Sequence, residues 1–178
     1  MKKKQLIRLV TAGLLLALGV LLPQIFGRIE FLGSTFLPMH LPVLICGAVC
    51  GGLYGGLCGA LVPLICTMLF GMPVFYPTAI AMAFELCAYG VLIALLYRRL
   101  HLNIYPALLL AMLGGRIVNG VLNWLLLSLQ GKGYALTAFF TACFINGLPG
   151  IVLQIVLVPV IVLLLQKAGF IVREEAHA

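Results

Sequence analysis

Three polar residues, Arg116, Asn119 and Asn123, lie within the otherwise apolar stretch MLGGRIVNGVLNW at residues 112–124. Their i, i+3, i+7 spacing places them on one face of a helix. Glu85 is charged as well and lies in a second apolar stretch. A charged side chain in a hydrocarbon environment costs about 2.5–3.5 kcal/mol on insertion scales, so Arg116 and Glu85 are predicted to face a partner or a wet cavity.

Hydrogen-bond donors outnumber acceptors among these four side chains. A guanidinium has about five N–H donors and two asparagine side chains add about four more, whereas a single carboxylate cannot accept from all of them. The excess favours an acceptor-rich ligand, a carboxylate or an amide, with Arg116 donating through its planar fork. The alternative is structural: an ion pair between Arg116 and Glu85, with Asn119 and Asn123 joining helices by hydrogen bonds.

Further candidate residues accompany this set. Asn146 is expected at a comparable depth in a later apolar stretch, where it would complete a polar pocket open to one side. Trp124 and Tyr76 are candidates for aromatic walls, because small ligands are commonly held between an apolar surface and a few polar groups. His40 is predicted either to cap a helix or pack at the membrane interface, or to contact a lid or ligand. Gln154 is predicted to form a hydrogen bond between helices.

The elements that position these residues are predicted to be membrane-spanning helices. Of the 178 residues, 64% are hydrophobic and 8% are charged, and the mean hydropathy is +1.24. These values lie outside the range of soluble domains and indicate an integral membrane protein. Since a spanning helix needs about 20 apolar residues, residues 1–178 are predicted to form one all-α domain with six transmembrane helices. The predicted spans are about 6–26, 39–53, 55–70, 78–97, 105–128 and 138–165.

The division between the second and third spans depends on length. Residues 38–70 form an uncharged run of 33 residues, which as one helix would extend about 50 Å and exceed a hydrocarbon core of about 30 Å. The chain must therefore turn, and CGGLYGG at residues 50–56 is the best place. The segments 26–40 and 70–77 are rich in Gly, Pro and aromatic residues and are predicted to be structured lids on the outer face.

Basic residues predict the orientation, because Lys and Arg gather on the cytoplasmic side of membrane proteins. Six spans with both termini in the cytoplasm place eight basic residues inside and two outside. Five or seven spans would put the YRRLH turn or the carboxyl end on the wrong side. The inner residues are Lys2, Lys3, Lys4, Arg8, Arg98, Arg99, Lys167 and Arg173, and the outer ones are Arg28 and Lys132.

Small residues four positions apart let helices approach closely in a bilayer. Such spacing is found at Gly13 and Ala17, and again at Gly47, Gly51, Gly55 and Gly59. One interpretation is packing within the chain, and the other is a docking face for a partner membrane protein.

The sequence lacks the motifs that are typical of several other function classes. The sequence has no phosphate-binding loop, no acidic pair suited to magnesium and no Ser or Cys nucleophile beside a His and a carboxylate, so the chain is not predicted to be an enzyme. The basic residues lie at segment ends rather than along one face, which argues against nucleic acid. The six cysteines lie in apolar stretches without a Cys-x-x-Cys pair, and no metal or cofactor is predicted. No inverted repeat is visible, so the chain is expected to bind a ligand while a partner supplies the energy.

In its predicted helices and in several of its motifs, the sequence resembles the substrate-binding S components of energy-coupling factor transporters. These are six-helix proteins that capture vitamins and related micronutrients in bacteria. The resemblance includes FLGSTFLPMHLPVLICGAVCG, PLICTMLFGMPVFYPTAIAMAFELCAYG, GGRIVNG and NGLPGIVLQIVLVP. It is closer to the broad riboflavin and pantothenate type than to the thiamin or biotin types. It implies a ligand pocket in the outer half, formed largely by the fourth to sixth spans and gated by the first and third outer loops. Pantothenate is the first expectation because a buried arginine suits its carboxylate, with riboflavin, niacin or a queuosine precursor as alternatives.

The resemblance also implies partners and a location. The partners would be a membrane-embedded coupling subunit and two cytoplasmic ATPases, and the location would be the bacterial cytoplasmic membrane. Gly13 and Ala17 match the family's small-residue docking motif in the first helix, with glycine in place of the more usual alanine. The amino-terminal histidine of metal-specific relatives is absent from MKKKQ, so cobalt or nickel is not expected.

Two other classes remain open on sequence alone. In a membrane scaffold of the rod-shape-determining kind, Gly13, Ala17 and the glycines of residues 47–59 would form the working surface, and Arg116 would be purely structural. In a small membrane enzyme that acts on lipid, an acid, a base or a metal site would be needed, and no such constellation is recognisable.

Overall fold

A computed structural model describes residues 2–27, 38–129, 131 and 148–168, and the part of the chain it describes is helical without strands. The π-helical turns η1 (Phe75–Ala79) and η2 (Ala94–Arg99) continue helix α5 (Ile80–Ile93) at its two ends, so residues 75–99 form one span. The elements are α1 (Lys2–Gly27), α3 (His40–Cys50), α4 (Gly52–Phe70), η1 (Phe75–Ala79), α5 (Ile80–Ile93), η2 (Ala94–Arg99), α6 (Ile104–Leu129) and α8 (Leu148–Lys167).

Five helices in the described residues are long and apolar enough to cross a membrane. They confirm the prediction of an all-α membrane protein. The first, third, fourth and fifth predicted spans agree with α1, α4, the 75–99 span and α6 to within a few residues. Of the sixth predicted span, 138–165, the part from residue 148 is α8, and residues 138–147 lie outside the described residues. The lid predicted for 26–40 also lies largely outside them.

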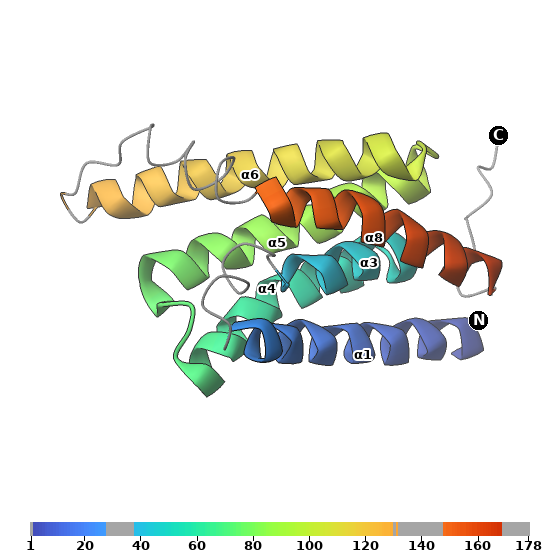
Figure 1. Ribbon diagram of the computed structural model, residues 1–178, viewed down its shortest axis with the longest axis horizontal. Coiled ribbons are helices and arrows are strands. Elements are labelled where there is room, and N and C mark those ends of the chain that lie inside the picture. Colours follow the sequence, from blue (N-terminus) through green and yellow to red (C-terminus); the bar gives the residue numbers. More distant parts are fainter. Residues whose placement is uncertain (1, 28–37, 130, 132–147, 169–178) are drawn as a thin grey trace.

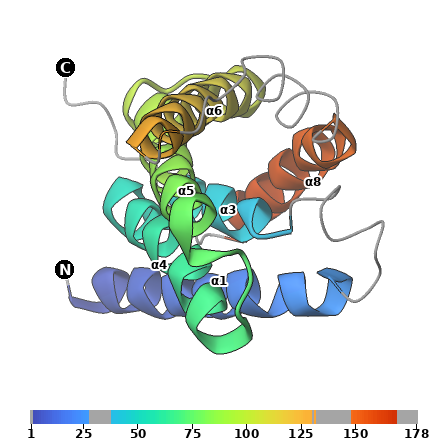
Figure 2. The ribbon, with the colours of Figure 1, turned by 90° about the vertical axis from the view of Figure 1, so that its left-hand side faces the viewer.

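The second predicted span, 39–53, agrees with α3 to within three residues, but α3 is shorter than a helix that crosses a membrane by itself. Helix α3 has 11 residues, which extend about 16 Å and cover only about half of a hydrocarbon core. Ten of these residues are buried. Figure 2 shows α3 at the centre of the bundle, where it contacts α1, α4, α5 and α8. It is therefore a core helix enclosed by longer ones.

The turn between α3 and α4 lies at Gly51, inside the predicted segment 50–56. Gly51 has φ 106° and ψ 172°, a conformation that an L side chain rarely adopts. Its N–H donates to the Gly47 carbonyl at 3.2 Å, and its own carbonyl accepts the first bond of α4 from Gly55 at 2.9 Å. The chain thus reverses direction at one residue, and the predicted turn is confirmed.

The remaining glycines of this region allow α3, α4 and α5 to approach at backbone distance. A Cβ on Gly55 would overlap the backbone of Gly47, and a Cβ on Gly90 would overlap the backbone of Gly55. A Cβ on Gly59 would overlap the carbonyl of Leu86. Internal packing is therefore the correct interpretation for these glycines, and a partner-docking role for them is wrong.

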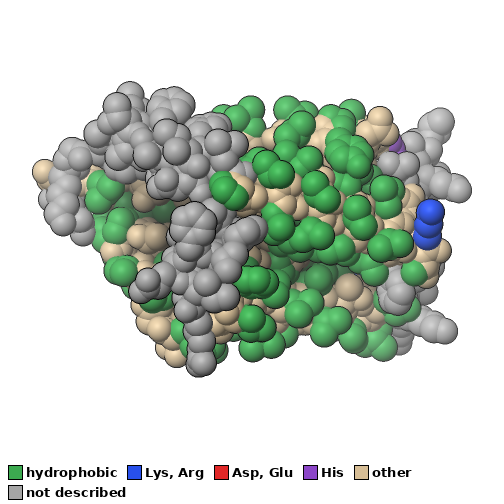
Figure 3. Space-filling view, in the orientation of Figure 1, with side chains coloured by type: hydrophobic (Ala, Val, Ile, Leu, Met, Phe, Trp, Pro, Cys, Tyr) green, Lys and Arg blue, Asp and Glu red, His purple; other side chains and the backbone are tan. Residues whose placement is uncertain are grey.

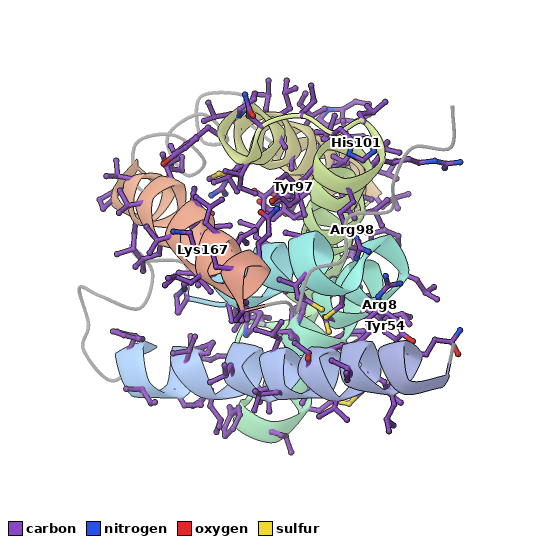
Figure 4. The ribbon with its side chains drawn as sticks, turned by 90° about the vertical axis from the view of Figure 1, so that its right-hand side faces the viewer. Arg8, Tyr54, Tyr97, Arg98, His101 and Lys167 are labelled. Carbon is purple, nitrogen blue, oxygen red and sulfur yellow. The ribbon has the colours of Figure 1, made fainter. Side chains whose placement is uncertain are left out.

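Apart from Arg116, the basic side chains that the structure describes lie at the ends of helices at one end of the bundle. Helix α1 begins and α8 ends at this same end (Figure 1), as predicted for an even number of passes. Hydrophobic side chains cover the middle of the molecule, with Lys and Arg at one end of it (Figure 3). We call this the basic end; it contains Arg8, Arg98 and Lys167 (Figure 4), together with Arg99, which lines the same cavity as Arg8 and Arg98.

Candidate functional site

Glu85 forms the centre of a buried polar cluster. Its side chain lies on α5 and is 2% exposed. Oε1 accepts a hydrogen bond from the Tyr89 hydroxyl at 2.7 Å, and Oε2 accepts one from Nδ2 of Asn119 at 2.6 Å. Tyr89 follows Glu85 by four residues and so lies above it on the same helix face. These bonds join α5 to α6 through a carboxylate within an apolar bundle.

Two cationic or basic side chains approach the same carboxylate. Nη1 of Arg116 on α6 lies 3.3 Å from Oε1 of Glu85, which is an ion pair. Nε2 of His40 on α3 lies 3.8 Å from the same oxygen, and the His40 ring centroid is 5.4 Å from that of Tyr89. We call Glu85, Tyr89, Asn119, Arg116 and His40 the Glu85 cluster. It is built from α3, α5 and α6.

The predicted polar face of α6 is confirmed. Nδ2 of Asn123 donates to Oδ1 of Asn119 at 2.7 Å and to the Asn119 carbonyl at 3.0 Å. Asn119 in turn donates to Glu85. The result is a chain of hydrogen bonds from α5 along one face of α6. Such chains are strongest in a low dielectric, where each bond polarises the next.

Gly115 makes room for the cluster, a feature that the sequence reasoning missed. A Cβ at Gly115 would overlap the ring of Tyr89. Glycine at this position therefore lets the tyrosine ring lie against α6, which brings its hydroxyl to Glu85. The Gly-Gly pair directly before Arg116 was the available signal.

The other predicted site residues are distributed differently. Tyr76 donates through its hydroxyl to the Leu126 carbonyl at 2.7 Å, so it fastens η1 to α6. Trp124 is 57% exposed, in contrast to the buried side chains of this cluster. His40 is 2% exposed, so its predicted interfacial position is wrong. Asn146 lies outside the described residues.

Gln154 on α8 is a buried polar residue whose predicted hydrogen bond to another helix has no counterpart among the described residues. Its side chain is 1% exposed, and within the described ranges neither amide atom has a hydrogen-bond partner. The two ring nitrogens of His40 are likewise without a hydrogen bond to any described residue. Helix α8 packs against α3, which carries His40. Buried polar atoms of this kind mark places where a ligand or water supplies the partner.

The first helix presents its small residues outward. Gly13 and Ala17 are exposed, and a Cβ built on Gly13 meets nothing within 4 Å. Ala12 and Leu15, in contrast, are 5% and 8% exposed and pack on the core. Within the residues that the structure describes, Gly13 and Ala17 are thus exposed rather than packed on the core.

In the part of the chain that the structure describes, a small helical membrane protein carries hydrogen-bonding side chains in its core. A membrane-embedded binding protein is the class that these features define. The family model "ECF transporter, substrate-specific component" matches residues 7–162, and the chain belongs to this family. No curated protein and no solved structure gives a significant match. The chain is thus a substrate-specific component that serves micronutrient uptake together with an energy-coupling factor transporter.

Proposed function

We propose that the chain captures its micronutrient at the Glu85 cluster and delivers it to a coupling subunit driven by two ATPases in a bacterial cytoplasmic membrane. The observation that supports this site is the set of polar side chains buried where α3, α5 and α6 meet. Arg116, Asn119 and Asn123 supply donors along α6. A bundle of this size has no structural need for so many desolvated polar groups, because apolar residues would pack as well.

The ion pair changes the expected chemistry of the ligand. A lone buried arginine would favour a carboxylate such as that of pantothenate, but Glu85 already lies 3.3 Å from Nη1 of Arg116. A second carboxylate would add uncompensated negative charge in a low dielectric, which is costly. An uncharged ligand with several acceptors leaves the charges balanced. We therefore propose an uncharged micronutrient such as riboflavin in preference to pantothenate.

His40 and Gln154 extend the proposed site across α3 and α8. Both side chains are at least 98% buried, and within the described ranges their polar atoms lack hydrogen-bond partners. An unsatisfied buried polar group costs about 1–3 kcal/mol. A ligand that bonds to these atoms recovers that free energy, so binding there is favourable. We therefore propose that the ligand lies between α8 and the Glu85 cluster.

The exposed face of α1 is proposed to dock the coupling subunit. Gly13 and Ala17 stand in the middle of a stripe of exposed apolar side chains on the same helix. Small residues at such a spacing allow a second helix to approach closely in the bilayer. The stripe includes Leu6, Val10, Leu14, Leu21 and Ile25.

The substrate proposal is tested by titrating the purified protein in detergent with riboflavin, niacin, pantothenate and a queuosine precursor. The proposal expects the uncharged ligands to bind more tightly than niacin and pantothenate, which carry a carboxylate. Asn119→Leu should weaken binding of the preferred ligand about tenfold. Trp124→Leu, on the same helix but exposed, is the matched control and should leave affinity unchanged.

Two outcomes contradict parts of this proposal separately. Tightest binding of pantothenate would retain the function but overturn the argument from charge balance. Binding of none of the ligands, together with a normally folded protein, would favour the membrane scaffold interpretation, in which Arg116 and Glu85 are purely structural.

A further inference from the structure

A second polar site lies at the basic end, away from the Glu85 cluster. A cavity of about 480 Å³ is lined by residues of α1, α3, α4, α5, η2 and the Gly51 turn. Three of the twelve lining residues are arginines, and the described lining contains no Asp or Glu. Figure 4 shows Arg8, Tyr54 and Arg98 next to one another when the basic end faces the viewer. The cavity therefore presents a concentrated positive charge.

Arg98 is held in place within this cavity. It is 7% exposed, and Nη1 donates to the Val49 carbonyl at 2.9 Å. That carbonyl belongs to the last turn of α3, where carbonyls lack partners within the helix. A Cβ on Gly51 would lie 3.1 Å from the same nitrogen, so glycine leaves space for the guanidinium. The sequence had suggested only that Arg98 belonged to a cytoplasmic turn.

The amino terminus of α4 adds a second source of positive potential. The first intrahelical bond of α4 is donated by Gly55 to Gly51. The amides of Gly52, Leu53 and Tyr54 precede it and have no acceptor one turn earlier in the helix. All three residues line the cavity. Helix amino termini and arginines both favour phosphate groups.

The apolar rim of the cavity distinguishes a lipid from a soluble anion. Leu53, Val91 and Leu95 line the cavity and are 73%, 44% and 40% exposed. Val91 and Leu95 belong to the lipid-crossing span of residues 75–99. A molecule with a phosphate among the arginines would thus have apolar side chains beside it that continue into the bilayer. Only an amphiphilic anion contacts both the arginines and these apolar side chains.

We propose that this cavity binds the headgroup phosphate of an anionic phospholipid of the leaflet at the basic end. Arg8, Arg98 and Arg99 contact the phosphate, the α4 amide groups face it, and the acyl chains lie along Leu53, Val91 and Leu95. Positive side chains near a membrane surface attract anionic lipids in this way. The bound lipid fixes the depth of the basic end in the membrane. This proposal does not depend on which micronutrient the Glu85 cluster binds.

Native mass spectrometry of the full chain tests the proposal. The protein is released from nanodiscs that contain equal amounts of phosphatidylglycerol and phosphatidylcholine. Wild-type protein is expected to retain one phosphatidylglycerol in preference to phosphatidylcholine. Arg8→Gln/Arg99→Gln should lower this preference by about fivefold for each arginine lost. Arg8→Lys/Arg99→Lys should largely restore it. Arg98 is left intact because its bond to Val49 also supports the fold.

Lys167→Gln is the matched control, because Lys167 is basic and lies at the same end but does not line the cavity. It should retain phosphatidylglycerol as wild type does. Equal retention of both lipids by the wild type, or unchanged retention by Arg8→Gln/Arg99→Gln, would overturn the site.

A second arm adds inorganic phosphate to lipid-free protein in detergent. If inorganic phosphate raised the melting temperature as much as phosphatidylglycerol does, the ligand would be a soluble anion, and the proposal of a lipid would be contradicted. Arg8→Gln/Arg99→Gln is expected to bind the micronutrient with the same affinity as the wild type, because neither arginine belongs to the Glu85 cluster.

Discussion

Nη1 of Arg116 lies 3.3 Å from Oε1 of Glu85, and the two side chains are 11% and 2% exposed. Glu85 and Arg116, which the sequence places in the middle of apolar stretches, therefore neutralise each other across α5 and α6. The desolvation of such a pair offsets much of its Coulomb attraction, whereas removal of one member leaves an uncompensated buried charge. Each charge is thus tolerated in the bundle because the other is there.

This pairing predicts a non-additive effect on stability. Arg116→Met should lower the free energy of unfolding by about 3–5 kcal/mol, because Glu85 is left buried without its partner. Adding Glu85→Gln should recover part of that loss. Thermal unfolding of the wild type, both single variants and the double variant in one detergent measures the coupling. A double variant whose loss equals the sum of the single losses would show that the ion pair contributes nothing.

The hydrogen bond between Asn119 and Glu85 predicts that position 119 does not accept a carboxylate. In Asn119→Asp, a second acid replaces the donor that lies 2.6 Å from Oε2 of Glu85, and like charges at this distance repel. Asn123→Asp is the matched control, since Asn123 contacts Asn119 rather than Glu85. At neutral pH the melting temperature should fall much more for position 119. Similar losses at the two positions would contradict the assigned contacts.

The glycine contacts predict opposite results for two alanine substitutions. Gly59→Ala should lower the free energy of unfolding by about 1–3 kcal/mol, because its Cβ overlaps the Leu86 carbonyl. Gly13→Ala should be neutral or slightly stabilising, since no atom lies within 4 Å of its Cβ and alanine favours helix. Denaturation of both variants under matched conditions checks this. Equal destabilisation would mean that Gly13 also packs within the chain.

Much of this structure follows from the one-dimensional pattern of apolar stretches. Length and hydropathy suffice for α1, α4, the 75–99 span and α6, because a bilayer forces each apolar run into a helix. The 33-residue run at 38–70 had to turn, and its glycines indicated where. The i, i+3, i+7 spacing placed Arg116, Asn119 and Asn123 on one face without knowledge of their partners.

The contacts between helices could not be obtained in the same way. Nothing in the sequence shows that α3 is enclosed by four other elements and needs only 11 residues. His40 looked interfacial because it opens an apolar run, but a short helix starts at the level of Glu85 rather than at the surface. The sequence assigned Arg98 only to a cytoplasmic turn, whereas the structure buries its guanidinium beside Gly51. Such features depend on which helices pack together.

The outward face of α1 predicts a separation between folding and assembly. Gly13→Leu/Ala17→Leu should leave melting temperature and ligand affinity unchanged, because both residues are exposed and neither belongs to the Glu85 cluster. The same change should prevent stable co-purification with a coupling subunit and stop ATP-dependent uptake, since a partner helix can no longer approach closely. Leu109→Ala/Leu113→Ala, which changes the bulk of two exposed side chains on α6 outside the α1 stripe, serves as the control. Full uptake by the leucine variant would refute docking through these residues.

The central claim is that polar residues in the core of this bundle hold a micronutrient, and a native mass spectrum of the wild-type protein purified from its own membranes tests it most directly. The account predicts a small molecule that remains bound on transfer from detergent and is identified after release. It also predicts that Asn119→Leu protein carries less of this molecule than wild type, whereas Trp124→Leu protein carries as much. Wild-type protein that carries lipid alone, or Asn119→Leu protein that retains the small molecule as fully as wild type, would contradict the account.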